Sequence, residues 1–346
     1  MFQIIIIELT YPLISVNERD IATVVGALFN PIGIAIGTLV SSSFVTSTAN
    51  GETTGMTSWL LCQAIITTVA GFLAFIFFQD KPKTPPSASQ ESTVYAQESS
   101  KSFKVALSTS YNQVIECFQE RDFLWLFCSF AIGLGIFNAV STLIEQLTIP
   151  ACATSNDAST FGGLLIGLGL VGAVIAGIIL DRTHRYRLAL RIGFSMSFLF
   201  TLAMTLLIQP GMINALSAMF AFLGFFMLPM LPVSFSAAAE ITYPVPESVS
   251  SGVLMTSGQL TGIAFIFALD ALIPSGPCNP TGSFTYPGSS VLLVVCIGFS
   301  ASFIMLFKGS TKRLDVDQGQ DSLITIQSLE PGTLKKSELD NPTMNL

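Results

Sequence analysis

Among the amide side chains in the long apolar runs of this chain, three stand out: Asn30, Asn138 and Gln259. A polar group at membrane depth is costly unless it faces protein or a water-filled cavity, so such residues often mark a solute pathway. The same amides can also form hydrogen bonds between helices, which remains the alternative for each of the three. The prediction is a site where they bind a small molecule through hydrogen bonds.

The chain has little with which to perform covalent catalysis or hold a metal. Its single histidine is His184, and its six cysteines show neither metal-ligand spacing nor a C-x-x-C pair. No nucleophile stands beside a base. The sequence therefore predicts no enzyme, no metal site and no cofactor.

A charged motif lies at the end of one apolar run. Gly177, Asp181, Arg182 and Arg185 follow the spacing G-x-x-x-D-R-x-x-R. A basic cluster beside a membrane would account for the arginines. It would not account for Gly177 and Asp181 at this spacing, so we favour a gating role for the motif.

The composition predicts a membrane protein with several spans. Of 346 residues, 51% are hydrophobic and 11% are charged, which is too apolar for a soluble domain of this size. About eight apolar runs are long enough to cross a bilayer as helices. They are residues 21–46, 59–78, 123–149, 161–180, 188–208, 215–238, 250–273 and 290–307. Pro229 and Pro232 should kink the sixth of these.

The basic residues predict the topology. All 15 Lys and Arg residues fall in alternate gaps between the runs, and cytosolic loops are the ones that collect such residues. Both termini are therefore predicted to be cytosolic, in the plasma membrane or an internal one. The net charge of −7 comes mostly from the linker and the tail, and no nucleic-acid partner is expected.

Two cysteines differ from the others by their location. Cys152 and Cys278 fall in loops on the non-cytosolic side, where thiols can be oxidised. They are either joined by a disulfide or remain two free thiols.

The chain divides into four regions. Residues 1–79 hold the first two full spans, and residues 80–122 form a linker that opens with a Pro- and Ser-rich stretch. The second half of the linker has apolar residues at helical spacing, which predicts an amphipathic helix along the cytosolic surface. Residues 123–308 hold six spans, and the polar tail 309–346 is expected to be disordered.

An internal repeat relates the first predicted span to the seventh. The segments beginning at Glu18 and Glu247 keep one register through the pairs Asn30/Gln259 and Gly33/Gly262. A repeat six helices apart is typical of two related six-helix bundles. On this interpretation residues 1–79 are the remainder of an N-terminal bundle, from the end of its fourth span through its fifth and sixth. About four spans would precede them.

These motifs resemble a known family. The D-R-x-x-R pattern is similar to the signature loop of the major facilitator superfamily, although His184 stands where Gly is usual, which predicts a less tight turn. Residues 231–259, with their Ala-Glu-x-Thr-Tyr-Pro segment, resemble the feline leukaemia virus subgroup C receptor-related transporters of that superfamily. The resemblance implies an all-α transmembrane helix bundle, spans 5–12 of the full architecture, and a solute such as choline, ethanolamine or haem.

The resemblance also bears on the site residues. Gln259 coincides with a family glutamine that faces the central cavity, whereas Pro31 replaces a glutamine and Asn138 replaces an aromatic residue of the choline-type members. A choline-type cation cage is therefore incomplete in this sequence. Glu247 joins the gating residues of the D-R-x-x-R motif.

The sequence thus predicts a secondary transporter of a small organic solute that works by alternating access. The alternative is a truncated, non-transporting or regulatory membrane protein of the same family. The expected partners are the solute, the lipid bilayer, and the missing N-terminal spans or another subunit.

Overall fold

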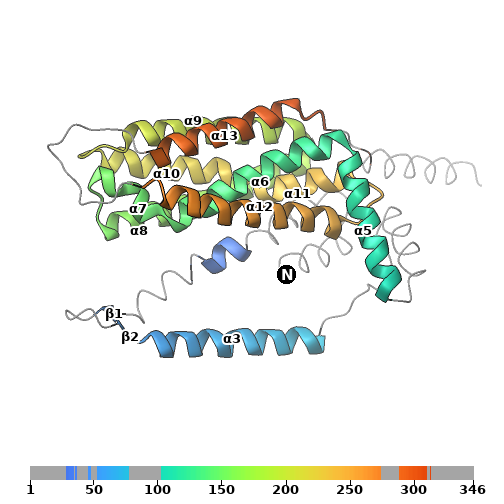
Figure 1. The fold of residues 1–346 in the computed structure, drawn as a ribbon, viewed down its shortest axis with the longest axis horizontal. Coiled ribbons are helices and arrows are strands. Elements are labelled where there is room, and N and C mark those ends of the chain that lie inside the picture. The colour runs from blue at the N-terminus through green and yellow to red at the C-terminus, as the bar shows by residue number, and fades with distance from the viewer. Residues whose placement is uncertain are drawn as a thin grey trace, which may run out of the picture.

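The computed structural model describes residues 29–34, 36, 46–47, 53–77, 103–273, 288–309 and 312. Nearly all of these residues are helical (Figure 1). The principal elements are β1 (Thr46–Ser47), β2 (Thr53–Thr54), α3 (Met56–Phe77), α5 (Phe103–Gln119), α6 (Arg121–Thr142), α7 (Ile144–Thr148), the 3-10 turn η3 (Ile149–Ala151), α8 (Ser155–Thr183), α9 (Tyr186–Leu207), α10 (Ile213–Met227), α11 (Met230–Ile241), α12 (Glu247–Asp270) and α13 (Gly288–Leu306). The two strands pair in antiparallel fashion just before α3.

Seven stretches within the described residues are long and apolar enough to cross a membrane. They are Met56–Leu73, Arg121–Thr142, Asn156–Thr183, Tyr186–Leu207, Ile213–Ile241, Glu247–Asp270 and Gly288–Leu306. These match seven of the predicted spans, so the helical membrane fold is confirmed. The first predicted span, residues 21–46, lies largely outside the described residues.

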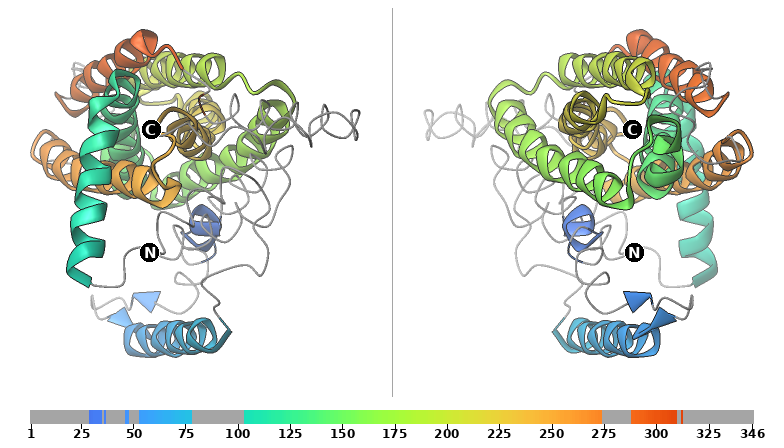
Figure 2. Two further views of the ribbon diagram at one scale, coloured as in Figure 1. Left: turned by 90° about the vertical axis from the view of Figure 1, so that its right-hand side faces the viewer. Right: turned by 90° about the vertical axis from the view of Figure 1, so that its left-hand side faces the viewer.

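Six of the spans pack side by side into one bundle, in which α10 and α11 together form a single span (Figures 1 and 2). One cluster of buried side chains, centred on Phe123, Phe235 and Phe307, fills the end where α6 begins. A second, which includes the stacked rings of Phe161 and Phe220, fills the opposite end. The bundle therefore has a packed interior along its whole length.

Glycines bring α8 and α10 into close contact. A Cβ atom at Gly172 would lie 2.1 Å from the carbonyl oxygen of Phe225, and one at Gly224 would lie 1.8 Å from that of Leu165. Small residues let helix backbones approach in this way in membranes. In contrast, Gly163 and Gly167 on α8 meet no described atom within 4 Å of such a Cβ.

Two predicted spans are interrupted. An interruption is present at Pro229, between Met227 and Met230, whereas α11 continues through Pro232, where a kink was also expected. The predicted run 123–149 was too long, since α6 ends at Thr142. The hydroxyls of Ser141 and Thr142 donate to the carbonyls of Phe137 and Asn138, and back-bonding of this kind bends helices.

The predicted amphipathic helix is present as α5, which runs crosswise to the bundle at the end where α6 begins (Figures 1 and 2). Its last turns pack on the bundle, where Cys117 is fully buried, whereas Tyr111 is 67% exposed. Tyr111 and Ile115 are thus left exposed by the described chain, as expected for a helix lying along a membrane surface.

Helix α3 lies apart from the bundle (Figure 2). None of its membrane-length stretch is buried, and Phe75 is 88% exposed. No described residue therefore covers this span, in contrast to the six spans of the bundle.

Candidate functional site

Two of the three predicted site residues meet. Asn138 of α6 donates from its side-chain Nδ2 to Oε1 of Gln259 on α12, at 3.2 Å. Helices α6 and α12 both begin at the end of the bundle near α5, so they run parallel. Gln259 lies at the middle of α12, roughly 18 Å from its first residue at 1.5 Å per residue. The pair therefore sits well inside the membrane-length part of the bundle.

The amide pair lies at a surface rather than in the packed core. Gln259 is exposed and Asn138 is partly exposed, and their neighbours Leu260 and Ile263 on α12 are 63% and 55% exposed. The bundle accordingly presents two polar amides on an otherwise apolar face.

Three glycines allow the two helices to approach where the pair forms. A Cβ at Gly262 would lie 3.2 Å from Asn138 Nδ2, and one at Gly258 would lie 2.5 Å from Leu134. A Cβ at Gly135 would lie 2.6 Å from the hydroxyl of Thr261. The tight seam therefore holds the two amides at hydrogen-bonding distance.

Thr261 was missed by the sequence analysis. Its hydroxyl donates to the carbonyl of Ala131, across the α6–α12 seam. The signal that could have located this seam is the Gly258/Gly262 pair, which has small residues four positions apart.

The third predicted residue, Asn30, lies in the short helical segment 29–34. Within that segment Pro31 is buried, and Ile32 packs against the small cluster formed by Ala173 and Leu228. Asn30 itself is exposed, and among the described residues no hydrogen bond joins it to Asn138 or Gln259. Phe137, the residue that precedes Asn138, packs against the same cluster.

The D-R-x-x-R motif forms the connection between α8 and α9. Gly177 is buried on α8, Asp181 is half-buried, and Arg182 and Arg185 are exposed. Glu247 is the first residue of α12, where a carboxylate is favoured by the helix dipole. These residues all lie at the end of the bundle near α5, and their gating role stays a prediction.

The expectation of a less tight turn at His184 is wrong. His184 adopts the left-handed conformation, with φ 48°, and its backbone N–H donates to Leu180 O at 2.7 Å. Histidine is among the non-glycine residues enriched in this conformation. His184 thus caps the C-terminal end of α8 in a conformation that glycine usually adopts.

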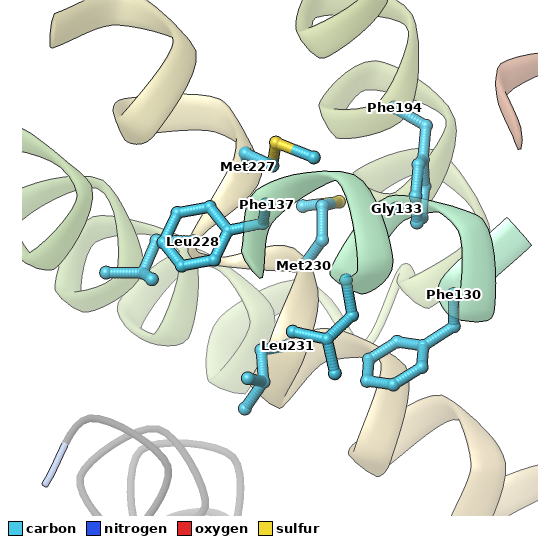
Figure 3. Close-up of a pocket in the computed structure, with 9 residues that line it drawn as sticks. Phe130, Gly133, Phe137, Phe194, Met227, Leu228, Met230 and Leu231 are labelled. Carbon is cyan, nitrogen blue, oxygen red and sulfur yellow. The ribbon is translucent and has the colours of Figure 1, made fainter. Parts of the chain in front are cut away.

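The break between α10 and α11 borders a small apolar void. Figure 3 shows Met227, Leu228, Met230 and Leu231 around it, facing residues of α6 and α9. Its volume is about 20 Å³, and an apolar cavity of this size stays dry. The interrupted span thus has a small apolar space beside its break.

Cys152, which follows η3 in the left-handed conformation, is disulfide-bonded. Its predicted partner, Cys278, lies outside the described residues.

Comparison with known proteins agrees with this architecture. Residues 5–266 match the model of the Major Facilitator Superfamily. Among solved structures, that of the superfamily transporter FucP in the outward conformation aligns with a TM-score of 0.54 and 16% identity, over 88% of this chain and 72% of that one. At this identity the likeness concerns the fold alone.

Several relatives are named as choline/ethanolamine transporters. FLVCR1 of Mus terricolor is 31% identical over 77% of this chain, flvcr2a of Danio rerio 32% over 72%, and human FLVCR2 29% over 86%. The aligned regions are 50%, 52% and 54% of these relatives, so the chain spans about half of their length. With a family match over more than half of its residues, the chain belongs to the major facilitator superfamily and is related to the FLVCR transporters.

Proposed function

We propose that the chain acts in the transport of a small polar organic solute by alternating access, and that Asn138 and Gln259 bind that solute. The observation that carries the proposal is their hydrogen bond on an exposed face, deep within the membrane-length part of the bundle. Asn30 is proposed as a further contact from the short helical segment that packs against α8 and the α10–α11 break.

The chemistry of the pair favours a solute with its own hydrogen-bond donors. The bond uses one N–H of Asn138 and one lone pair of Gln259, so the other amide groups remain available for a ligand. A primary ammonium or a hydroxyl can donate to the two amide oxygens. A quaternary ammonium has no N–H and is recognised instead by aromatic faces.

Among the solutes in the relatives' names, we therefore propose ethanolamine over choline. Ethanolamine carries a primary ammonium and a hydroxyl, which suit two neighbouring amides. The resemblance noted from the sequence supports this choice, because it places Asn138 where the choline-type members have an aromatic residue.

Alternating access requires the bundle ends to open and close. We propose that Asp181, Arg182, Arg185 and Glu247 brace the end of the bundle near α5 in one state, with Gly177 allowing close packing of α8. The span formed by α10 and α11 would bend at its proline break, where the apolar void leaves space.

The test is uptake of radiolabelled ethanolamine, choline and haem into proteoliposomes that contain the full chain. The expected result is saturable ethanolamine uptake that excess unlabelled choline inhibits only weakly. Equal or better uptake of choline would refute the solute assignment while leaving transport intact.

The rival function is a non-transporting or regulatory protein. It is favoured by the exposure of α3, which no described residue covers. Absence of uptake, both by the chain alone and by the chain fused to the N-terminal half of a relative, would contradict transport and support this rival.

A further inference from the structure

A basic cleft opens at the end of the bundle near α5, well separated from the amide pair. It has a volume of about 530 Å³ and lies between the α8–α9 turn, α9, α11 and the residues that follow α13. The side chains that matter for its charge are Arg185, Arg187, Arg191, Lys308 and Glu240.

The charge of the cleft is strongly positive. Four of these side chains are cationic and one is a carboxylate, Glu240, which is only 5% exposed and already engaged with another group. Arg185, Arg187 and Lys308 are exposed, and no carboxylate pairs with their side chains among the described residues. Three cationic groups are therefore available to an anion that enters.

Arg191 forms a wall of the cleft. Its guanidinium donates to the carbonyls of Met305 and Phe307, which holds the end of α13 against α9. Its Nε atom is buried and has no hydrogen-bond partner among the described residues. Arg191 is thus held in place within the cleft, and the exposed side chains of Arg185, Arg187 and Lys308 lie around it.

The surroundings of the cleft indicate a lipid rather than a soluble anion. Leu188, Met305 and Leu306, next to it on α9 and α13, are 50%, 47% and 52% exposed. Helices α9 and α13 lie on the side of the bundle away from α3, as Figure 2 shows. An acyl chain can therefore lie along these helices while the headgroup enters the cleft at the membrane boundary.

We propose that this cleft binds the phosphate-bearing headgroup of an anionic membrane lipid. Arg185, Arg187 and Lys308 contact the phosphates, and Arg191 shapes the site. Basic pockets between membrane helices bind such headgroups, and each Lys or Arg near a membrane surface contributes about 1 kcal/mol to anionic-lipid binding. The cleft includes the α8–α9 turn, so an occupying lipid ties α8, α9 and α13 together at one end. The proposal does not depend on which solute is transported.

The test is titration of the purified full chain in detergent with dioctanoyl phosphatidylinositol bisphosphate. The double variant Arg187→Gln/Lys308→Gln removes two exposed contacts without touching the D-R-x-x-R motif. Binding should weaken roughly 30-fold, the factor that corresponds to two charges at about 1 kcal/mol each. The conservative variant Arg187→Lys/Lys308→Arg should retain most of the binding.

The matched control is Arg121→Gln/Lys312→Gln, which removes the same charge at the same end of the bundle but outside the cleft. Binding by this control should be nearly unchanged, and dioctanoyl phosphatidylcholine should not compete. Equal weakening of both double variants would overturn the proposal, because only general charge would matter. Binding of free inositol trisphosphate as tightly as the lipid would overturn the assignment to a membrane lipid.

Discussion

Among single side chains, Gln259 is the one on which transport should depend most directly. Its Oε1 accepts from Asn138, and its own N–H groups remain available to a solute. Replacing it with Leu removes a polar group from an exposed position without leaving a cavity. We predict that Gln259→Leu lowers the initial rate of solute uptake about 10-fold, as expected for the loss of one or two hydrogen bonds.

The matched control is Gln209→Leu, the same substitution just beyond the end of α9, where the amide donates to the local carbonyl of Leu206. Uptake per molecule at the membrane should be normal in this variant. Loss of surface expression in Gln259→Leu alone would instead identify the amide pair as a purely structural link between helices.

Cys117 gives a prediction about the docking of α5. Burial, with a smaller contribution from Glu116, raises the pKa of this thiol to about 11. With this pKa, roughly one thiol in a thousand is ionised at pH 8. The thiolate is the form that reacts with maleimide. We predict that Cys117 resists maleimide at that pH and reacts when the pH is raised towards 11 or the protein is unfolded, as peptide mass spectrometry would detect.

The control thiol comes from Tyr111→Cys, on the same helix but at a position that is 67% exposed. It should react rapidly at pH 8. Similar labelling rates at positions 117 and 111 would mean that the last turns of α5 are not docked on the bundle.

Sequence reasoning located Asn138 and Gln259 because a polar amide in an apolar run is conspicuous whatever the fold. The same reasoning passed over Thr261 and Gly135, because threonine and glycine are common in membrane helices and their residue type does not say which neighbour they face. Only the packing of α6 on α12 reveals that their contact sets the distance between the two amides.

At the level of whole helices, the contact between α8 and α10 should be sensitive to a single methyl group. A Cβ at Gly172 would collide with the backbone oxygen of Phe225 at 2.1 Å, and backbone cannot rotate away as a side chain can. We predict that Gly172→Ala destabilises the protein by about 1–3 kcal/mol, the usual cost of overpacking. Thermal unfolding in detergent would measure this loss as a lower Tm.

Gly167→Ala on the same helix is the control. No described atom lies within 4 Å of its added methyl, and Ala is a better helix former than Gly by about 1 kcal/mol. Its Tm should be unchanged or higher. Equal destabilisation by the two variants would show that α8 tolerates no added methyl for reasons unrelated to α10.

Helix boundaries followed the sequence where a strong local signal exists. Proline removes a backbone donor, and the break between α10 and α11 lies at Pro229, although α11 continues through Pro232. The end of α6 at Thr142 was not predicted. There the hydroxyls of Ser141 and Thr142 donate to backbone carbonyls one turn earlier, and the residue type alone does not say which rotamer a serine or threonine adopts. Likewise, the spacing of Gly163 and Gly167 is that of a helix contact, yet both glycines face away from the described bundle.

Across the whole molecule, the described basic residues lie at one end of the bundle. Arg121 begins α6, Arg185 joins α8 to α9, and the backbone N–H of Lys308 donates to Asp122. No Lys or Arg occurs in the described loops at the opposite end, residues 143–154, 208–212 and 271–273. Along the sequence, basic residues occur in every second gap between spans. Because each span crosses the bundle, these gaps all lie at the same end of it.

This separation predicts the orientation of the protein in the membrane. Thr183 and Met212 are exposed near opposite ends of α9, whose 22 residues extend about 33 Å, close to the thickness of the hydrocarbon core. Since cytosolic loops collect Lys and Arg, the thiol of Thr183→Cys should react with a membrane-impermeant maleimide only after the plasma membrane is permeabilised. The thiol of Met212→Cys should react in intact cells that display the protein.

Tags near Tyr95 and at Leu346 should be cytosolic and one near Gly276 exoplasmic, all three in parts of the chain outside the described residues. Labelling of positions 183 and 212 from the same side would contradict the assignment of α9 as a span, and exchange of the two sides would invert the predicted orientation.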